Sequence, residues 1–246
     1  MLFASILAGG TGTRMNLGDT PKQFLPLADK PMIIHTLDKF CLCGEFDAIY
    51  VGVHQDWTDY TQSLLGKYHL GEACPIKVVA GGETRNDTIL NTLQAIEADY
   101  GVADDHLVVS HDAARPFVSL RTIKANIACV QGGSACDTVI AAADTIVHSN
   151  LSGDAIVDIP DRAQMFQGQT PQSFRIKDFE ASYAALSDVQ KAGLTDACKV
   201  LLAAGLPVKL VRGDSSNIKL TTAMDYKLAQ MMIAVHESDV NDEAGD

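Results

Sequence analysis

The residues best suited to chemistry begin with a glycine-rich run close to the N-terminus. It reads Leu7-Ala8-Gly9-Gly10-Thr11-Gly12-Thr13-Arg14-Met15. Glycines let the backbone turn tightly and bring its N–H groups against phosphate oxygens. Seven residues after Arg14, Pro21-Lys22-Gln23-Phe24 adds a second cation on a proline-stiffened loop. Two cations beside such a loop favour a nucleoside triphosphate site, and the alternative is an ordinary tight turn or a site for another ligand.

A second motif, Gly81-Gly82-Glu83-Thr84-Arg85-Asn86-Asp87-Thr88, lies between an apolar run and a helical pattern. Glycines here let the chain lie flat against a base, and the helix N-terminus offers N–H donors that lack intrahelical partners. In the alternative interpretation, Asn86 or Asp87 merely caps the helix.

A third motif, His111-Asp112-Ala113-Ala114-Arg115-Pro116, follows another apolar run. Its place predicts the carboxyl edge of the sheet, where open α/β sheets bind ligands. Asp112 there can reach a ribose or magnesium, and Arg115 can reach a phosphate. A structural salt bridge between Asp112 and Arg115 is the alternative.

Later motifs begin at Gln169-Thr170-Pro171-Gln172, at Thr195-Asp196 and at Asn217-Ile218-Lys219. Lys219 is the strongest chemical candidate of these, because it follows a predicted strand and turn. Thr195-Asp196 fits ligand binding and helix capping equally well.

Apolar runs alternate with amphipathic helical patterns along most of the chain. Strands are predicted at 2–7, 48–53, 76–79 and 107–110, and helices at 31–40, 56–68 and 86–98. This alternation predicts an α/β fold with a mostly parallel sheet and helices on both sides. A single domain is expected over 1–235, ending in a helix that starts with the capping-box pattern Thr222-Ala-Met-Asp225 and runs to about Val235. The acidic tail 236–246 is expected to be disordered.

Residues 141–168 do not follow this alternation of strands and helices. Two strand-like pieces, 145–148 and 156–159, flank a turn-rich segment, which predicts a β-arm projecting from the sheet edge. Because isolated hairpins are marginally stable, the arm is expected to pack on something, such as a second subunit.

The composition excludes several classes of partner. A formal net charge of −12 disfavours nucleic acid and anionic lipid, and no apolar run approaches the roughly 20 residues of a membrane helix. The six cysteines show neither CxxC spacing nor nearby histidines in metal spacing, which favours reduced thiols in a cytoplasmic protein.

In this order, the motifs resemble the cytidylyltransferases that act on alditol phosphates, over about residues 2–235. The resemblance implies a Rossmann-like nucleotidyltransferase domain, CTP as donor, Mg²⁺ as cofactor, and a homodimer whose β-arm reaches the neighbouring subunit. It implies catalytic roles for Arg14, Lys22 and Lys219. CTP contacts are implied for Ala8, Gly9, Gly10, Thr11, Gly12, Gly82, Glu83, Arg85, Asn86, Thr88 and Asp112, the last also being the metal-ligand candidate. Alditol-phosphate contacts are implied for Arg115, Thr145, Arg162 and Thr195.

Two branches of this family differ in their substrate. The segments Gln167-Gly168-Gln169-Thr170-Pro171-Gln172 and Ala143-Asp144-Thr145-Ile146-Val147 resemble the ribitol 5-phosphate branch of teichoic-acid synthesis. The branch using 2-C-methylerythritol 4-phosphate, in isoprenoid synthesis, usually has Pro-Val before the Asp-Thr and a basic residue shortly after it. It also often has Asp where this chain has Glu83. Transfer of CMP to ribitol 5-phosphate is therefore expected, with the erythritol reaction as the alternative.

Two other classes of protein fit less well. A nicotinamide-dependent oxidoreductase requires a third glycine, where Met15 stands, and an acidic residue after the second strand, where Val53-His54 stands. A non-catalytic nucleotide-sensing protein has no need of the four cations Arg14, Lys22, Arg115 and Lys219.

Overall fold

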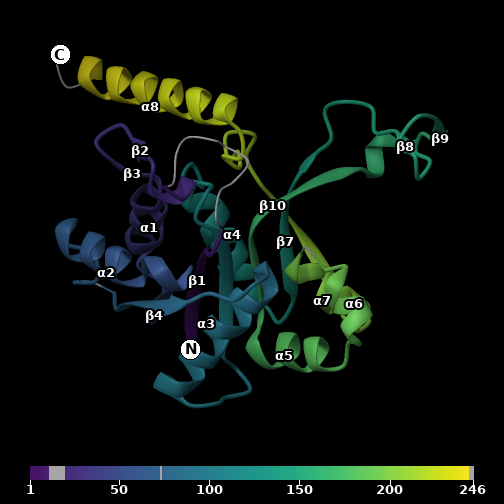
Figure 1. The fold of residues 1–246 in the computed structure, drawn as a ribbon, viewed down its shortest axis with the longest axis horizontal. Helices are drawn as coiled ribbons and strands as arrows, with labels where there is room; N and C mark the ends of the chain where they lie inside the picture. Colours follow the sequence, from purple (N-terminus) through teal and green to yellow (C-terminus); the bar gives the residue numbers. More distant parts are fainter. Residues whose placement is uncertain (11–19, 73, 195, 244–246) are drawn as a thin grey trace.

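A seven-stranded sheet forms the centre of the protein, and helices cover both of its faces (Figure 1). The computed structural model describes residues 1–10, 20–72, 74–194 and 196–243. In spatial order the strands are β11 Val208–Arg212, β7 Ala135–Ala141, β10 Phe166–Arg175, β6 Leu107–Asp112, β1 Leu2–Ala8, β4 Ala48–Val53 and β5 Ile76–Ala80. Neighbours are parallel except where β10 pairs antiparallel with β6 and β7. The predicted α/β fold with a mostly parallel sheet is confirmed.

The central strand β1 shows why the sheet must be covered on both sides. All seven of its residues are buried, and successive side chains point to opposite faces. Ala4 and Ile6 belong to one hydrophobic cluster, whereas Phe3 and Leu7 belong to another. A strand that is apolar on both faces is stable only between two layers of helices.

The helices divide between these two clusters. On one face lie α1 Met32–Cys43, α2 Thr58–Lys67 and α4 Leu120–Gln131. On the other lie α3 Arg85–Tyr100, α5 Ile176–Ala184 and α7 Ala197–Ala203. The three predicted helices correspond to α1, α2 and α3. The short elements are η2 Lys22–Phe24, β2 Pro26–Leu27, β3 Lys30–Pro31, η3 Gln55–Trp57 and α6 Asp188–Ala192.

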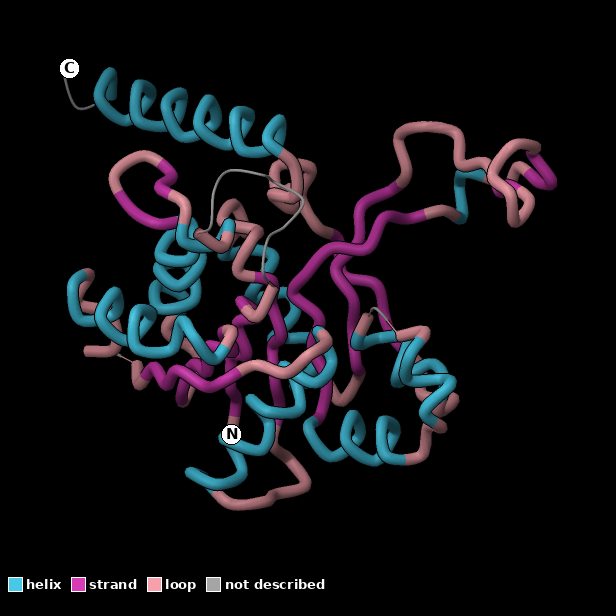
Figure 2. Tube along the Cα trace, viewed as in Figure 1, coloured by secondary structure: helices cyan, strands magenta, loops and turns pink. Residues whose placement is uncertain are grey.

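The segment between β7 and β10 leaves the body of the molecule as the predicted arm (Figures 1 and 2). Its tip pairs β8 His148–Ser149 with β9 Ile156–Asp158, and η4 Arg162–Gln164 leads back to β10. The tip strands are shorter than predicted, and the long strands β7 and β10 pair at the base of the arm.

The last helix, α8 Ala223–Glu243, begins as predicted and ends later. Thr222 and Asp225 cap each other's backbone N–H groups, which is the expected capping box. The helix continues beyond the expected end near Val235 as far as Glu243, and the disorder expected from residue 236 stays a prediction. No glycine or proline interrupts the sequence before Gly245, so nothing in the backbone ends the helix earlier.

Candidate functional site

A pocket opens where β1 and β6 end and α3 begins. It lies at the carboxyl edge of the sheet, the usual place for ligands in open α/β folds. The two glycine motifs, the Pro21–Phe24 loop, the end of β6 and the segment before α8 all contribute to it. The lining residues are Leu7, Ala8, Gly9, Gly10, Lys22, Gln23, Gly82, Glu83, Thr84, Arg85, Thr88, Asp112, Ala113, Ala114 and Lys219.

Thr88 joins the two glycine motifs. Its hydroxyl accepts a hydrogen bond from the Gly82 N–H at 3.1 Å and donates to the Thr84 carbonyl at 3.0 Å. A Cβ at Gly9 would lie 3.0 Å from the Thr88 hydroxyl, and one at Gly82 would lie 2.3 Å from the Cβ of Asp87. Gly82 therefore requires glycine, whereas a side chain at Gly9 would be in tight contact with Thr88.

The loop that carries Lys22 is fixed to the first glycine motif by a buried amide. Gln23 donates from Nε2 to the carbonyls of Ala8 at 2.7 Å and Gly10 at 3.1 Å. Lys22 donates from Nζ to the Leu220 carbonyl at 2.8 Å. Lys22 thereby reaches the pocket beside the segment that carries Lys219.

The N-terminus of α3 also faces the pocket. Thr84 and Asp87 form a capping box, in which the Thr84 hydroxyl accepts from the Asp87 N–H and the Asp87 carboxylate accepts from the Thr84 N–H. The motif therefore does contain a cap, as the alternative interpretation proposed, but Thr84 takes the capping position. The remaining first-turn N–H groups and the helix dipole favour an anion at this end.

Asp112 is surrounded by three cations at the floor of the pocket. Its Oδ1 lies 3.1 Å from Nε of Arg85, and its Oδ2 lies 2.7 Å from Nζ of Lys219 and 3.8 Å from Nε of Arg115. Burial alone would raise the pKa of Asp112, but the charges of Arg85, Lys219 and Arg115 hold that pKa far below its ordinary value. Asp112 is thus a carboxylate at every physiological pH, and the group as a whole carries a positive charge.

Some guanidinium N–H groups around Asp112 lack a hydrogen-bond acceptor among the described residues. Among the described residues, Nη1 and Nη2 of Arg85 and Nε of Arg115 are buried and have no hydrogen-bond partner. Buried guanidinium donors are costly to leave unpaired, and phosphate oxygens are the acceptors that match them best. The group beside the glycine motifs is therefore suited to an anion.

His111 supports this group from behind. Its Nδ1 lies 2.9 Å from the Thr170 hydroxyl, which accepts from the Asp112 N–H at 3.1 Å, and its Nε2 lies 3.2 Å from the Arg115 carbonyl. Burial lowers the pKa of His111 to about 4, so the ring is neutral near pH 7. His111 thus positions both charged neighbours and adds no charge of its own.

The structure brings many of the predicted site residues together and leaves others apart. Ala8, Gly9, Gly10, Lys22, Gly82, Glu83, Arg85, Thr88, Asp112 and Lys219 share the pocket. Arg115 adjoins it through Asp112, in the ion pair considered from the sequence. Asn86 does not line it, because its side chain is buried and donates to the Leu194 carbonyl at 3.4 Å. Thr145 and Arg162 are exposed on the arm, and Thr11, Gly12, Arg14 and Thr195 lie outside the described residues.

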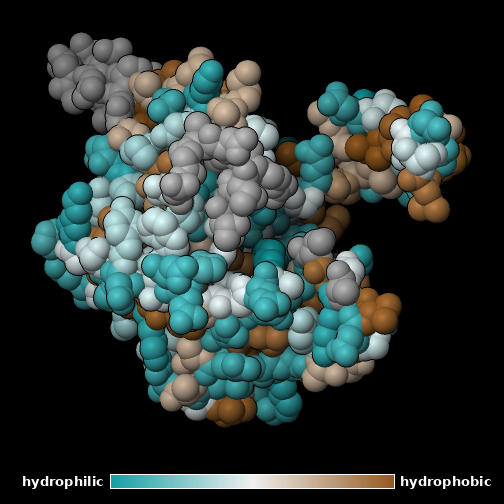
Figure 3. Space-filling model, in the orientation of Figure 1, coloured by the Kyte–Doolittle hydropathy of each residue, from teal (hydrophilic) through white to brown (hydrophobic). Residues whose placement is uncertain are grey.

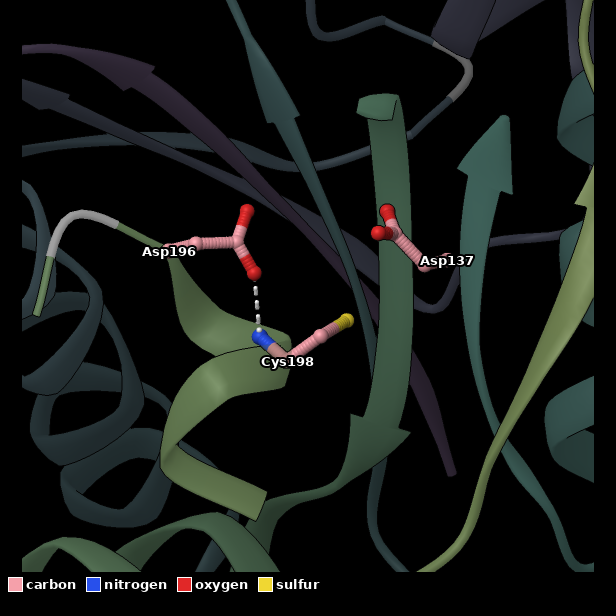
Figure 4. A group of neighbouring side chains, drawn as sticks. All are labelled: Asp137, Asp196 and Cys198. Carbon is pink, nitrogen blue, oxygen red and sulfur yellow. Dashed lines mark hydrogen bonds between the residues drawn. The ribbon is translucent and has the colours of Figure 1, made fainter. Parts of the chain in front are cut away.

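Sequence reasoning missed a polar cluster that includes Asp137 and Asp196 (Figure 4). Nε2 of Gln172, in β10, donates to Asp137 in β7 at 3.0 Å and to Asp196 at 2.6 Å. Asp196 is also the N-cap of α7, as one interpretation of the Thr195-Asp196 pair proposed. Burial and the nearby charge of Asp196 raise the pKa of Asp137 to about 6. The signal that could have identified this cluster is an aspartate within an otherwise apolar strand.

The fold and the pocket are those of a nucleotidyltransferase. The chain belongs to the 2-C-methyl-D-erythritol 4-phosphate cytidylyltransferase (IspD) family, whose model matches residues 2–235. It is 48% identical over 233 residues to the ribitol-5-phosphate cytidylyltransferase of Lactiplantibacillus plantarum, covering 95% of this chain and 98% of that protein. A protein of the same name from Streptococcus pneumoniae is also 48% identical, covering 95% and 99%. The crystal structure of 4-diphosphocytidyl-2C-methyl-D-erythritol synthase from Anaerococcus prevotii matches with a TM-score of 0.78 at 26% identity, covering 95% of this chain and 96% of that chain.

The raised pKa of Asp137 predicts how this group affects stability. Between about pH 4 and pH 6 the folded protein keeps a proton on Asp137 that the unfolded chain has lost, so the stability from this group falls as the pH rises through that window. Asp137→Asn removes the titration. We expect the melting temperature of the variant, relative to wild type, to rise between pH 4.5 and pH 7.5 in differential scanning calorimetry. A difference that stays constant across this range contradicts the assignment.

Proposed function

We propose that the protein transfers CMP from CTP to ribitol 5-phosphate, giving CDP-ribitol and pyrophosphate. The observation that carries the proposal is 48% identity, over 95% of the chain, to relatives named ribitol-5-phosphate cytidylyltransferase. The same reaction with 2-C-methylerythritol 4-phosphate is the alternative. It has less support, because the solved structures of that name are more distant, as the 26% identity to the Anaerococcus prevotii protein illustrates.

The pocket provides what a nucleoside triphosphate needs. Backbone N–H groups of the two glycine motifs and of the first turn of α3 would meet the base, the ribose and the phosphates. Lys22 and Lys219 both line the pocket, Lys22 being bonded to the Leu220 carbonyl, and they would neutralise the triphosphate. Arg14, which precedes Lys22 in the sequence, is proposed to act with it.

Magnesium is the proposed cofactor. Asp112 is the carboxylate at the pocket floor, and a single carboxylate combined with substrate phosphates is a common Mg²⁺ site. The residues fit such an ion when the triphosphate is present, because Lys219, whose side chain is 38% exposed, can then move its charge from Asp112 to the phosphates. When bound, the ion would neutralise charge on the triphosphate.

The chemistry proposed is in-line displacement at the α-phosphorus of CTP. An oxygen of the alditol phosphate forms a bond to that phosphorus, and the bond to the bridging oxygen of the β-phosphate breaks, so pyrophosphate leaves with the electron pair. A phosphate monoester is already a strong anion near neutral pH, so no side chain needs to remove a proton from it. The protein's task is to align two polyanions and offset their charge, for which it supplies Lys22, Lys219 and the arginines beside Asp112.

A homodimer joined through the β-arm is also proposed. The arm exposes large apolar side chains, which gather at its tip (Figure 3). They are Val147, Leu151, Ile156, Val157 and Ile159. A two-stranded tip is marginally stable alone, and an exposed apolar patch of this kind is typical of a protein interface. In the dimer, Thr145 and Arg162 would bind the alditol phosphate in the neighbouring subunit, together with that subunit's Arg115 and Thr195.

The protein is proposed to be cytoplasmic. Its proposed ligands are small molecules only. All six cysteines are free, as in a reducing compartment. None of the described helices combines the length and apolar character needed to cross a bilayer. A net charge of −12 opposes binding to nucleic acid, so the positive charge of the pocket is local.

The proposed reaction predicts magnesium-dependent pyrophosphate release when CTP and ribitol 5-phosphate are mixed with the protein. An enzyme-coupled phosphate assay should compare ribitol 5-phosphate with 2-C-methylerythritol 4-phosphate at equal concentration. Release with ribitol 5-phosphate alone is expected. Release only with the erythritol compound would establish the alternative substrate. No pyrophosphate release with either compound would refute the proposal.

Lys22→Ala should lower turnover far more than it weakens CTP binding. A cation that meets charge developing at the α-phosphorus acts mainly on the transition state, so kcat should fall by about 10²-fold or more, with the KM for CTP within about threefold. Lys177→Ala is a suitable control, because Lys177 pairs with Asp104 on the surface and does not line the pocket. A variant that loses CTP affinity and keeps its kcat contradicts this role.

Arg162→Ala should raise the KM for the alditol phosphate and leave CTP binding intact. If each arm serves the neighbouring site, mixing Arg162→Ala with Lys22→Ala subunits should restore about a quarter of wild-type activity, since half of the dimers are mixed and each has one complete site. Activity is measured after joint refolding, at ribitol 5-phosphate below its KM. No gain over the separate variants means that the arm serves its own subunit.

A further inference from the structure

Asp137 and Asp196 are held together by one amide at the edge of the proposed substrate site. Asp137 extends from β7 and Asp196 from the start of α7, and the two carboxylates point toward one another (Figure 4). Gln172 donates both of its amide hydrogens here, one to each carboxylate. The amide therefore stabilises two like charges that would otherwise separate.

The cluster of Asp137, Asp196 and Gln172 has hydrogen-bond acceptor sites that are not filled. Gln172 is fully buried, and its Oε1 has no partner among the described residues. Asp196 uses Oδ1 to cap α7 through the N–H groups of Cys198 and Lys199, so its Oδ2 faces Gln172. A carboxylate has about four acceptor sites, and the bonds found here do not fill them. Both carboxylates remain partly exposed. A ligand that donates hydrogen bonds would complete this cluster.

The cluster is continuous with the anion-binding group around Asp112. The charges of Arg85 and Arg115 act on Asp137 as well as on Asp112. Arg115 also reaches the Gly168 carbonyl, at 3.5 Å from Nη2, and a Cβ at Gly168 would lie 3.7 Å from Oδ2 of Asp137. The missing side chain leaves the Asp137 carboxylate accessible between the arginine and the arm.

We propose that Asp137 and Asp196, held by Gln172, bind hydroxyl groups at the end of the alditol that is remote from its phosphate. The inference rests on the proposed function. An alditol phosphate carries an anion at one end and hydroxyl donors along the rest of its chain. The structure offers the complementary order, with guanidinium groups beside Asp112 and carboxylates beyond them. The cluster thereby selects the length of the polyol.

A metal ion suits this cluster less well than hydroxyl groups do. Cys198 lies beside the two carboxylates, but burial raises the pKa of its thiol, and the thiol donates toward the Cys136 carbonyl at 3.7 Å. Metals bind the thiolate, which is disfavoured here. The amide hydrogens of Gln172 already approach both carboxylates, and the two arginines oppose a further cation. Hydroxyl groups are neutral, so the arginines do not repel them, and they need no thiolate.

The experiment compares Asp137→Asn with wild type on alditol phosphates of different length. Asparagine keeps the shape but replaces a charged acceptor, so kcat/KM for ribitol 5-phosphate should fall about tenfold. The inhibition constant of glycerol 3-phosphate, which lacks the remote hydroxyls, and the KM for CTP should each stay within about twofold. Asp196→Ser should show the same selective loss of kcat/KM for ribitol 5-phosphate. Serine still caps α7, so the fold should be kept. Asp104→Asn, an exposed aspartate paired with Lys177, is the matched control.

Each other outcome has a definite meaning. Unchanged kinetics with ribitol 5-phosphate, or equal losses for ribitol 5-phosphate, glycerol 3-phosphate and CTP, would overturn the inference, because the cluster would then act on the fold alone. Calorimetric titration with Zn²⁺ alone gives a further test, since binding to wild type that disappears in Asp137→Asn would assign the cluster to a metal instead. If wild type shows no turnover of ribitol 5-phosphate, the proposed function itself fails.

Discussion

The site depends on one buried carboxylate that keeps three cations within reach of each other. Arg85, Arg115 and Lys219 come from distant parts of the chain and converge on Asp112. Without that negative charge, their mutual repulsion in a poorly solvated pocket would separate them. Because Asp112 balances only one of the three charges, the group stays positive, and some of its donors have no partner in the described part of the chain. A phosphate ligand would therefore meet cations that the fold has already positioned.

This arrangement requires a rigid frame, which the sheet provides. Asp112 ends β6, and its backbone N–H is fixed by the Thr170 hydroxyl that His111 also contacts. Thr170 belongs to β10, the one antiparallel strand in the sheet, where the pairing with β7 shifts register between Gly168 and Gln172. Irregularities of this kind redirect side chains near functional sites. Here the shift places Thr170 behind Asp112 and Gln172 between the carboxylates of Asp137 and Asp196.

Much of the fold and most of the pocket could be predicted from the sequence, because their signals are local. Buried parallel strands are continuous apolar runs, and glycines mark the places where Gly9 and Gly82 approach other chain segments. The order of the motifs also indicated the family. Residues whose roles depend on partners far along the chain could not be found in this way. Gln23, His111 and Asp137 act through Ala8, Thr170 and Gln172, and pairing between such distant residues follows from topology, which no local pattern encodes. The end of α8 was misplaced for another reason, since acidic composition alone does not stop a helix.

The two carboxylate environments differ in a way that bears on substrate choice. Asp112 is compensated by cations, so its pKa is depressed and its charge is fixed. Asp137 is largely buried and faces a second carboxylate, so its pKa is raised to about 6 despite the hydrogen bond from Gln172, and its charge is costly. A fold gains nothing in stability from such a pair, because a neutral polar pair of the same shape would avoid the repulsion. Strained carboxylates of this kind are typical of places that bind a ligand. A polyol phosphate is the class of ligand that would use both environments at once, with its anion beside Asp112 and its hydroxyls beside Asp137.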